Sequence, residues 1–113
     1  MQNQIENVMT IINYIEDHLT ENPDLDTIAE AMHYSKYHMH RVFAEETGLT
    51  IHNYMQRRRL TEAAKLLVFS EKPIMEIALI AGYESQQAFT AVFKEMYKKT
   101  LGKYREEEEF YPL

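Results

Sequence analysis

The stretch IMEIALIAGYESQQAFTAVFK, residues 74–94, predicts two helices separated by a tight turn. Apolar residues recur at intervals of three and four on both sides of Gly82, which is the spacing of the buried face of an amphipathic helix. Gly82 favours the end of the first helix, and Ser85 is a residue type that caps the start of a helix. The adjacent Gln86 and Gln87 then fall in the first turn of the second helix, on the side away from its apolar stripe.

The same pattern occurs earlier in the chain. Four residues recur 49 positions later, Leu25, Ile28, Ala29 and Tyr34 as Ile74, Ile77, Ala78 and Tyr83. After one extra residue the offset becomes 50, and Ser35, Val42, Phe43, Thr50 and Tyr54 return as Ser85, Val92, Phe93, Thr100 and Tyr104. One helical hairpin is a common packing motif. Two copies in register favour a pair of helix-turn-helix motifs, whose second helices enter the major groove of DNA.

Helical spacing extends over the rest of the sequence. Further helices are predicted over about 5–19, from Ile51 to Phe69 behind a Thr50 cap, and from Thr100 through Tyr104. The predicted fold is all-α with about seven helices, in which a long linker helix joins two helix-turn-helix (homeodomain-like) subdomains. The boundaries are 1–50 for the first subdomain, 51–70 for the linker helix, 71–107 for the second and 108–113 for an acidic tail or the start of a linker. A 19-residue helix spans about 28 Å, close to the roughly 34 Å between half-sites one turn apart.

The charge of the chain is unevenly distributed. The formal net charge is −6, which by itself argues against a nucleic-acid partner. Residues 1–30 carry seven acidic and no Lys or Arg side chains, and residues 106–109 are four glutamates. Residues 31–105 hold all twelve Lys and Arg against seven acidic residues, a net of +5. The basic part of the chain is therefore the part that contains both motifs.

Other classes of protein find little support. The absence of cysteine excludes disulfides, thiolate metal sites and a cysteine nucleophile. His38 and His40 are two residues apart and diverge on a helix, so no metal site and no cofactor are expected. No catalytic triad order, phosphate loop or carboxylate pair occurs, so an enzyme is not expected. No apolar run approaches a membrane span, and no secretory signal is present, which favours a soluble, cytoplasmic protein.

At these residues the sequence resembles the DNA-binding domain of the AraC/XylS family of bacterial transcription regulators. The resemblance rests on YSKYHMHRVFAEETG (34–48), RRLTEAAKLL (58–67), residues 74–94 and KYR (103–105). The segments SKYHMHR and ESQQAFT are most similar to the corresponding segments of the MarA/Rob subgroup. The resemblance implies a monomer that binds an asymmetric, two-box site in double-stranded DNA and contacts RNA polymerase. In Rob-like proteins a ligand-sensing domain follows at about residue 113, so the chain could be free-standing or part of a longer regulator.

The resemblance also implies which side chains read bases. They are Tyr37, His40 and Arg41 in the first recognition helix, about 35–46, and Gln86, Gln87 and Thr90 in the second, about 85–97. Glutamine bonds adenine and arginine bonds guanine in the major groove, each with about 1–3 kcal/mol of discrimination. The sequence departs from the family at three positions: Ala91 replaces a frequent arginine, Lys98 a glycine and Leu101 a proline.

Several polar side chains are natural phosphate anchors at or near helix termini. They are Ser35, Lys36, Thr50, Ser85, Lys98, Lys99 and Lys103. For any single lysine of this set, an ordinary solvent-exposed position explains its presence equally well. The alternative function is a helical protein-interaction module that keeps this fold but binds DNA only weakly, which the acidic ends and the missing arginine at position 91 favour.

Overall fold

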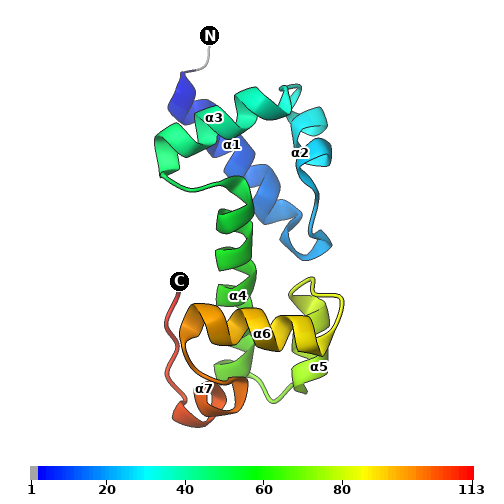
Figure 1. The fold of residues 1–113 in the computed structure, drawn as a ribbon, viewed down its shortest axis with the longest axis vertical. Helices are drawn as coiled ribbons and strands as arrows, with labels where there is room; N and C mark the ends of the chain where they lie inside the picture. Colours follow the sequence, from blue (N-terminus) through cyan, green and yellow to red (C-terminus); the bar gives the residue numbers. More distant parts are fainter. Residues whose placement is uncertain (1–2) are drawn as a thin grey trace. The chain divides into compact units, whose positions relative to one another are not determined.

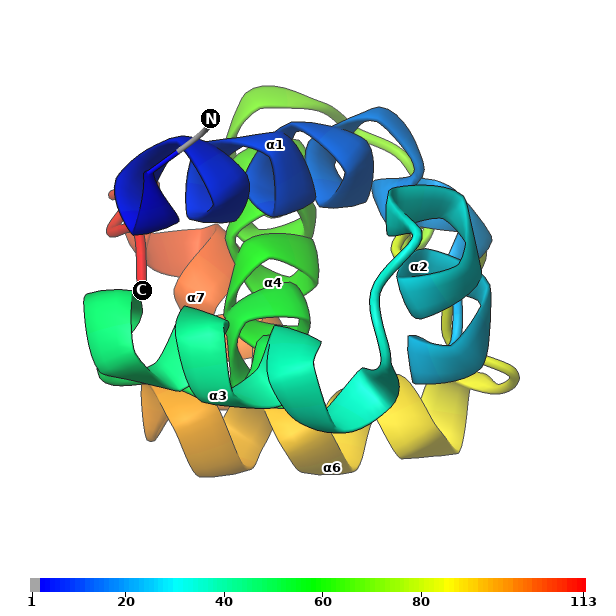
Figure 2. The same cartoon turned by 90° about the horizontal axis from the view of Figure 1, so that it is seen from above.

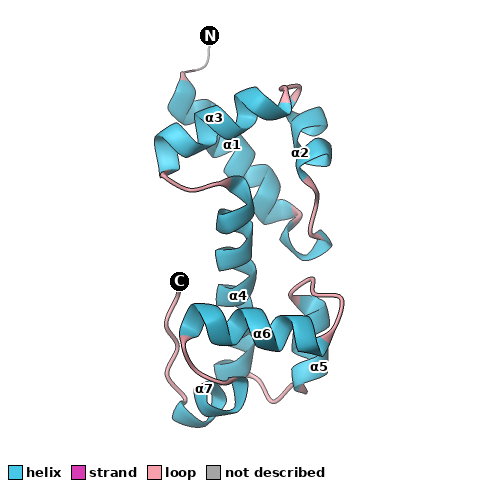
Figure 3. Ribbon diagram, viewed as in Figure 1, coloured by secondary structure: helices cyan, strands magenta, loops and turns pink. Residues whose placement is uncertain are grey.

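The computed structural model describes residues 3–113, and within that range it contains helices and loops but no strands (Figures 1 and 3). The seven α-helices confirm the all-α prediction. They are α1 Gln4–Asp17, α2 Leu25–Met32, α3 Lys36–Thr47, α4 Ile51–Phe69, α5 Ile74–Ile80, α6 Gln86–Tyr97 and α7 Leu101–Glu107, with one 3-10 turn, η1 Leu19–Glu21. Contacts divide the chain into two compact units, residues up to 56 and residues 57–113.

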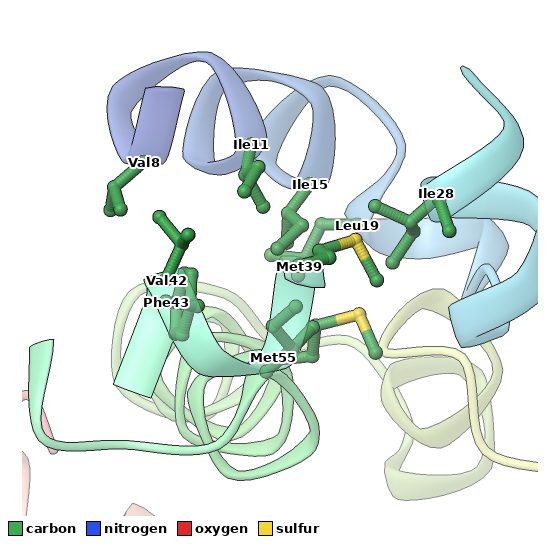
Figure 4. Close-up of a cluster of buried hydrophobic side chains, with 11 residues drawn as sticks. Val8, Ile11, Ile15, Leu19, Ile28, Met39, Val42, Phe43 and Met55 are labelled. Carbon is green, nitrogen blue, oxygen red and sulfur yellow. The ribbon is translucent and has the colours of Figure 1, made fainter. Parts of the chain in front are cut away.

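The first unit is built from α1, α2, α3 and the beginning of α4. Figure 2 shows α1 and α3 on opposite sides of α4, with α2 beside them. Its core holds eleven buried side chains, most of which Figure 4 labels: Val8, Ile11, Ile15, Leu19, Ile28, Ala29, Met39, Val42, Phe43, Ile51 and Met55. Burial of this set on one face of each helix fixes the opposite face of α3 toward solvent.

The second unit repeats this arrangement with its own core. Its buried side chains are Leu60, Ala63, Ala64, Leu67, Ile77, Ala78, Ala81, Phe89, Phe93, Leu101 and Tyr104. Aromatic rings fill much of it, since Phe93 lies 4.6 Å from the Tyr97 ring and 5.3 Å from the Tyr104 ring between centroids. The two ends of α4 thus contribute to different cores, Ile51 and Met55 to the first and Leu60 onward to the second.

Side-chain caps set several helix starts, among them those predicted at Thr50 and Ser85. The side chains of Asp24, Ser35, Thr50, Ser85 and Thr100 each accept a hydrogen bond of 2.8–3.2 Å from the backbone N–H three residues on. Pro73 lies at the N-cap of α5 with φ of −59° and ψ of 148°, and it makes no side-chain cap hydrogen bond.

The repeat extends to the backbone conformation of the turns. Gly48 and Lys98 end α3 and α6 with φ of 74° and 61°, and they are 50 residues apart. His33 and Gly82, 49 residues apart, have φ of 60° and 87° in the turns before those helices. Each motif therefore has two residues in the left-handed conformation, and only one of the two is glycine. In the first motif it is Gly48, at the end of the second helix. In the second motif it is Gly82, in the turn between the helices.

The acidic tail folds back onto the second unit instead of continuing as a solvated helix end. The Tyr111 N–H donates to the Tyr104 hydroxyl at 2.8 Å, and the Tyr97 hydroxyl donates to the Tyr111 carbonyl at 2.7 Å. The Leu113 N–H donates to the Thr61 hydroxyl at 3.1 Å. These contacts tie the tail to side chains of α4, α6 and α7.

Candidate nucleic-acid interface

The outward face of α3 is held in place by the turn that precedes it. The Tyr34 N–H donates to the Ala29 carbonyl at 2.9 Å, which closes the α2–α3 turn. Met39, Val42 and Phe43 point into the core, so the other side of the helix is free for a ligand. Tyr37 on that side is 77% exposed, whereas His40 is half-buried. Tyr37 and Arg41 are thus the more accessible of the predicted base-reading residues in α3.

Arg41 is held between two polar neighbours on its own helix. Its guanidinium lies 3.4 Å from the Glu45 carboxylate and 3.2 Å from Nδ1 of His38. Glu45 also accepts a hydrogen bond from Gln4 at 3.0 Å, so the carboxylate joins α1 to α3. The pair with Glu45 is solvent-exposed and therefore weak. The Arg41 guanidinium can therefore leave this pair at small cost.

The outward side of the first two turns of α6 carries no charged side chain. Phe89 and Phe93 are fully buried, which leaves Gln86, Gln87 and Thr90 exposed on the first two turns. These three residues and Ala91 line an open hollow of about 450 Å³ whose remaining wall is Met75 of α5. Met75 is 61% exposed and was not among the predicted site residues. It lies 49 residues after Asp26, which was not a predicted site residue either, so the repeat gave no signal for it.

The predicted phosphate anchors differ in their surroundings. Ser35, Thr50 and Ser85 use their side-chain oxygens as acceptors for the caps described above, which leaves the hydroxyl hydrogens available to an anion. Lys36 lies 3.1 Å from Asp26 in an exposed ion pair. Lys98 and Lys103 are exposed. Lys99 is paired with Glu107, and that hydrogen bond raises the pKa of the Lys99 ammonium.

Arg105 supports the fold of the second unit. Its guanidinium donates to the carbonyls of Leu67, Ser70 and Lys72 at 3.0, 3.4 and 2.8 Å, which satisfies backbone groups at and after the end of α4. Arg59 is also buried, and its guanidinium lies 5.4 Å from the Tyr83 ring centroid. Burial raises the pKa of the Tyr83 hydroxyl, while the positive charge of Arg59 opposes that shift. These arginines hold the second core rather than offering charge to a ligand.

Among residues 3–113, no group of three or more His, Cys, Asp or Glu side chains is arranged to hold a metal ion. No helix in this range is both long and apolar enough to cross a membrane.

Two exposed, serine-capped helices on matched motifs are the signature of a paired helix-turn-helix protein, and comparison with known proteins agrees. A family model described as a helix-turn-helix domain matches residues 28–107. The chain belongs to the AraC-type helix-turn-helix family. This family consists of DNA-binding transcription regulators, so the expectation that the chain is not an enzyme is confirmed.

Individual AraC-type relatives cover most of the chain. The transcriptional regulator YbfP of Bacillus subtilis is 42% identical over 87% of the chain, and the probable transcription factor PqrA of Proteus vulgaris is 41% identical over 89%. The chain spans 85% of PqrA but only 33% of YbfP. Among solved structures, the C-terminal domain of AraT, a response regulator from Geobacillus stearothermophilus, is 28% identical with a TM-score of 0.86, covering 93% of this chain and 87% of that one.

Proposed function

We propose that this AraC-type chain is a sequence-specific DNA-binding transcription regulator that inserts α3 and α6 into successive major grooves of an asymmetric site. One observation carries the proposal: both units present the same serine-capped helix with the outward side of its first two turns facing solvent. Residues in those turns are the ones that reach base edges in helix-turn-helix complexes. The two units therefore act as two reading heads joined through α4.

In this proposal Tyr37, His40 and Arg41 read bases in one box, and Gln86, Gln87 and Thr90 read bases in the other. Ser35, Lys36, Thr50, Ser85, Lys98, Lys99 and Lys103 bind phosphate and set the register of the protein on DNA. Lys36 and Lys99 exchange their carboxylate partners for phosphate, and Asp26 and Glu107 then return to solvent. The Lys36–Asp26 pair is exposed, so its exchange costs little, whereas the part-buried Lys99–Glu107 pair costs more to separate.

The proposal extends to partners and place of action. A chain with two reading heads occupies both boxes without a second copy, so we propose that it binds DNA as a monomer. Regulation of transcription requires an effect on RNA polymerase, and we propose that the bound chain contacts the polymerase in the cytoplasm. A helical protein-interaction module that keeps this fold but binds DNA only weakly is not favoured by membership in this family.

Salt dependence of binding is the direct biochemical test. The logarithm of the association constant should fall linearly with the logarithm of the salt concentration, with a slope near −0.9 for each phosphate neutralised. Lys98→Ala should reduce the magnitude of that slope by about 0.9. Binding to a promoter duplex that does not respond to salt would contradict the proposal.

A further inference from the structure

The hollow between α5 and α6 has no counterpart of the same chemistry in the first unit. Its walls are Met75, Gln86, Gln87, Thr90 and Ala91, all exposed and all uncharged. The residues at the equivalent positions of the first motif are Asp26, Lys36, Tyr37, His40 and Arg41. There, Asp26 and Lys36 form an ion pair of 3.1 Å, and Arg41 carries a full charge. At equivalent positions, the first motif thus presents charged side chains and the second motif presents only uncharged ones.

Ala91 and Met75 make the second of these surfaces apolar. Ala91 ends at its methyl group, so it leaves open the space that a long side chain on α6 would fill. The methionine side chain is unbranched and adaptable and carries no hydrogen-bonding group stronger than a thioether. Thr90 adds a second methyl group.

The major groove of DNA offers one strongly apolar feature, the C5-methyl group of thymine, and that group is the natural occupant of such a hollow. Resting on the function proposed above, we infer that Met75, Thr90 and Ala91 form a receptor for a thymine methyl group. Gln86 or Gln87, at its rim, bonds a neighbouring adenine. The second head therefore selects an A·T-rich box by combining an amide contact with an apolar one, while the first head reads through charged side chains.

Replacing thymine by deoxyuridine isolates this contact, because it removes one methyl group and preserves base pairing and the O4 acceptor. The probe is a duplex recovered by selection from randomised DNA, with each thymine of the two boxes replaced in turn by deoxyuridine. At one thymine of the α6 box, the replacement should weaken binding of the 113-residue chain about fourfold, the effect of removing one buried methyl group.

Two exposed residues on α5 provide a matched pair of variants. Met75→Ala removes the wall of the hollow, whereas Leu79→Ala truncates a residue of similar exposure, 60% against 61%, that does not line it. Met75→Ala should bind the thymine and deoxyuridine duplexes with equal affinity. Leu79→Ala should keep the fourfold difference. Ala91→Arg fills the hollow and should also abolish the difference, while adding a charge that steepens the salt dependence.

The outcomes separate this inference from the proposed function. Specific two-box binding with no thymine of the α6 box sensitive to deoxyuridine would overturn the inference and leave the function standing. A deoxyuridine effect that persists undiminished in Met75→Ala would also overturn it, because another residue would then contact the methyl group. Absence of any sequence preference would contradict the proposed function itself.

Discussion

Gly48 and Lys98 occupy equivalent positions at the ends of α3 and α6, and in both the backbone is left-handed. Gly48 has φ of 74° and Lys98 has φ of 61°, and each N–H donates to the carbonyl four residues earlier at 2.9 Å. Glycine adopts this conformation without cost, whereas a residue with a Cβ is destabilised by about 1–2 kcal/mol. The second motif therefore carries local backbone strain at a position where the first motif has none.

Lys98→Gly should raise the free energy of unfolding by about 1 kcal/mol, because it relieves the left-handed strain at the end of α6. Urea denaturation measures the change. Lys98→Ala is the control, since it removes the charge and keeps the strain, and it should leave the stability nearly unchanged. Gly48→Ala should destabilise by about 1 kcal/mol from the backbone alone, because no atom lies within 4 Å of its added Cβ. A destabilised Lys98→Gly would contradict this assignment.

Tyr104→Phe should loosen the tail at Tyr111. It removes the acceptor of the Tyr111 N–H, a loss of about 1 kcal/mol, and hydrogen exchange at that amide should accelerate. Tyr111→Phe is the matched control, because the Tyr111 hydroxyl bonds only the exposed Glu109 among the contacts seen in this structure. Equal exchange rates in the two variants would show that the hydroxyl of Tyr104 does not hold the tail.

The stability of the second unit should fall at alkaline pH. Burial, together with the nearby Tyr104, raises the pKa of the Tyr97 hydroxyl well above its ordinary value of 10.0. The unfolded chain then loses this proton at a lower pH than the folded chain. The contribution of Tyr97 is therefore fully present below about pH 10 and is lost progressively as the pH rises above it. Tyr97→Phe should make unfolding less dependent on pH in this range, as measured by denaturation between pH 9 and about 11.

Arg41→Ala should lower affinity for the selected site more than affinity for random DNA. Loss of a guanine contact costs about 1–3 kcal/mol at the specific site, whereas random DNA loses only a charge. Competition binding with labelled duplexes measures both. Arg57→Ala, which also removes an exposed arginine, is the control and should reduce both affinities alike. Equal losses in Arg41→Ala would make Arg41 a phosphate contact.

Gln86→Ala and Gln87→Ala should relax base preference in one box only. Tyr37→Ala changes the position equivalent to Gln87 in the first motif and should relax the other box. Sequencing the DNA pool that each variant retains measures the effect. Relaxation of both boxes by a glutamine variant would show that the two heads do not read independently.

The helices could be predicted from the sequence because their signals are local. Ser35, Ser85 and Thr50 cap the helices that follow them, and α4 has the predicted bounds. The docked tail could not be predicted, because its contacts are distant in sequence: Leu113 bonds Thr61, 52 residues earlier. The tail's composition indicated only its charge.

The sequence predicted which positions of the candidate site are exposed, but not which neighbouring side chains contact them. The exposed positions of α3 and α6 follow from the apolar stripe on the other side of each helix. The ion pairs that Arg41 and Lys99 form depend on how the side chains pack, and the spacing of residues in the sequence does not determine that packing. Met75 was missed because an exposed methionine resembles ordinary surface, and its position beside Ala91 depends on how α5 packs against α6.

Selection from randomised duplex DNA at near-physiological salt, followed by sequencing of the retained pool, tests the central claim most directly. Two reading heads on one chain predict an asymmetric motif of two short boxes with centres about one helical turn apart. Variants in α3 should alter one box and variants in α6 the other. Recovery of a pool with no enriched sequence, or with a single box that α6 variants leave unchanged, would contradict the account.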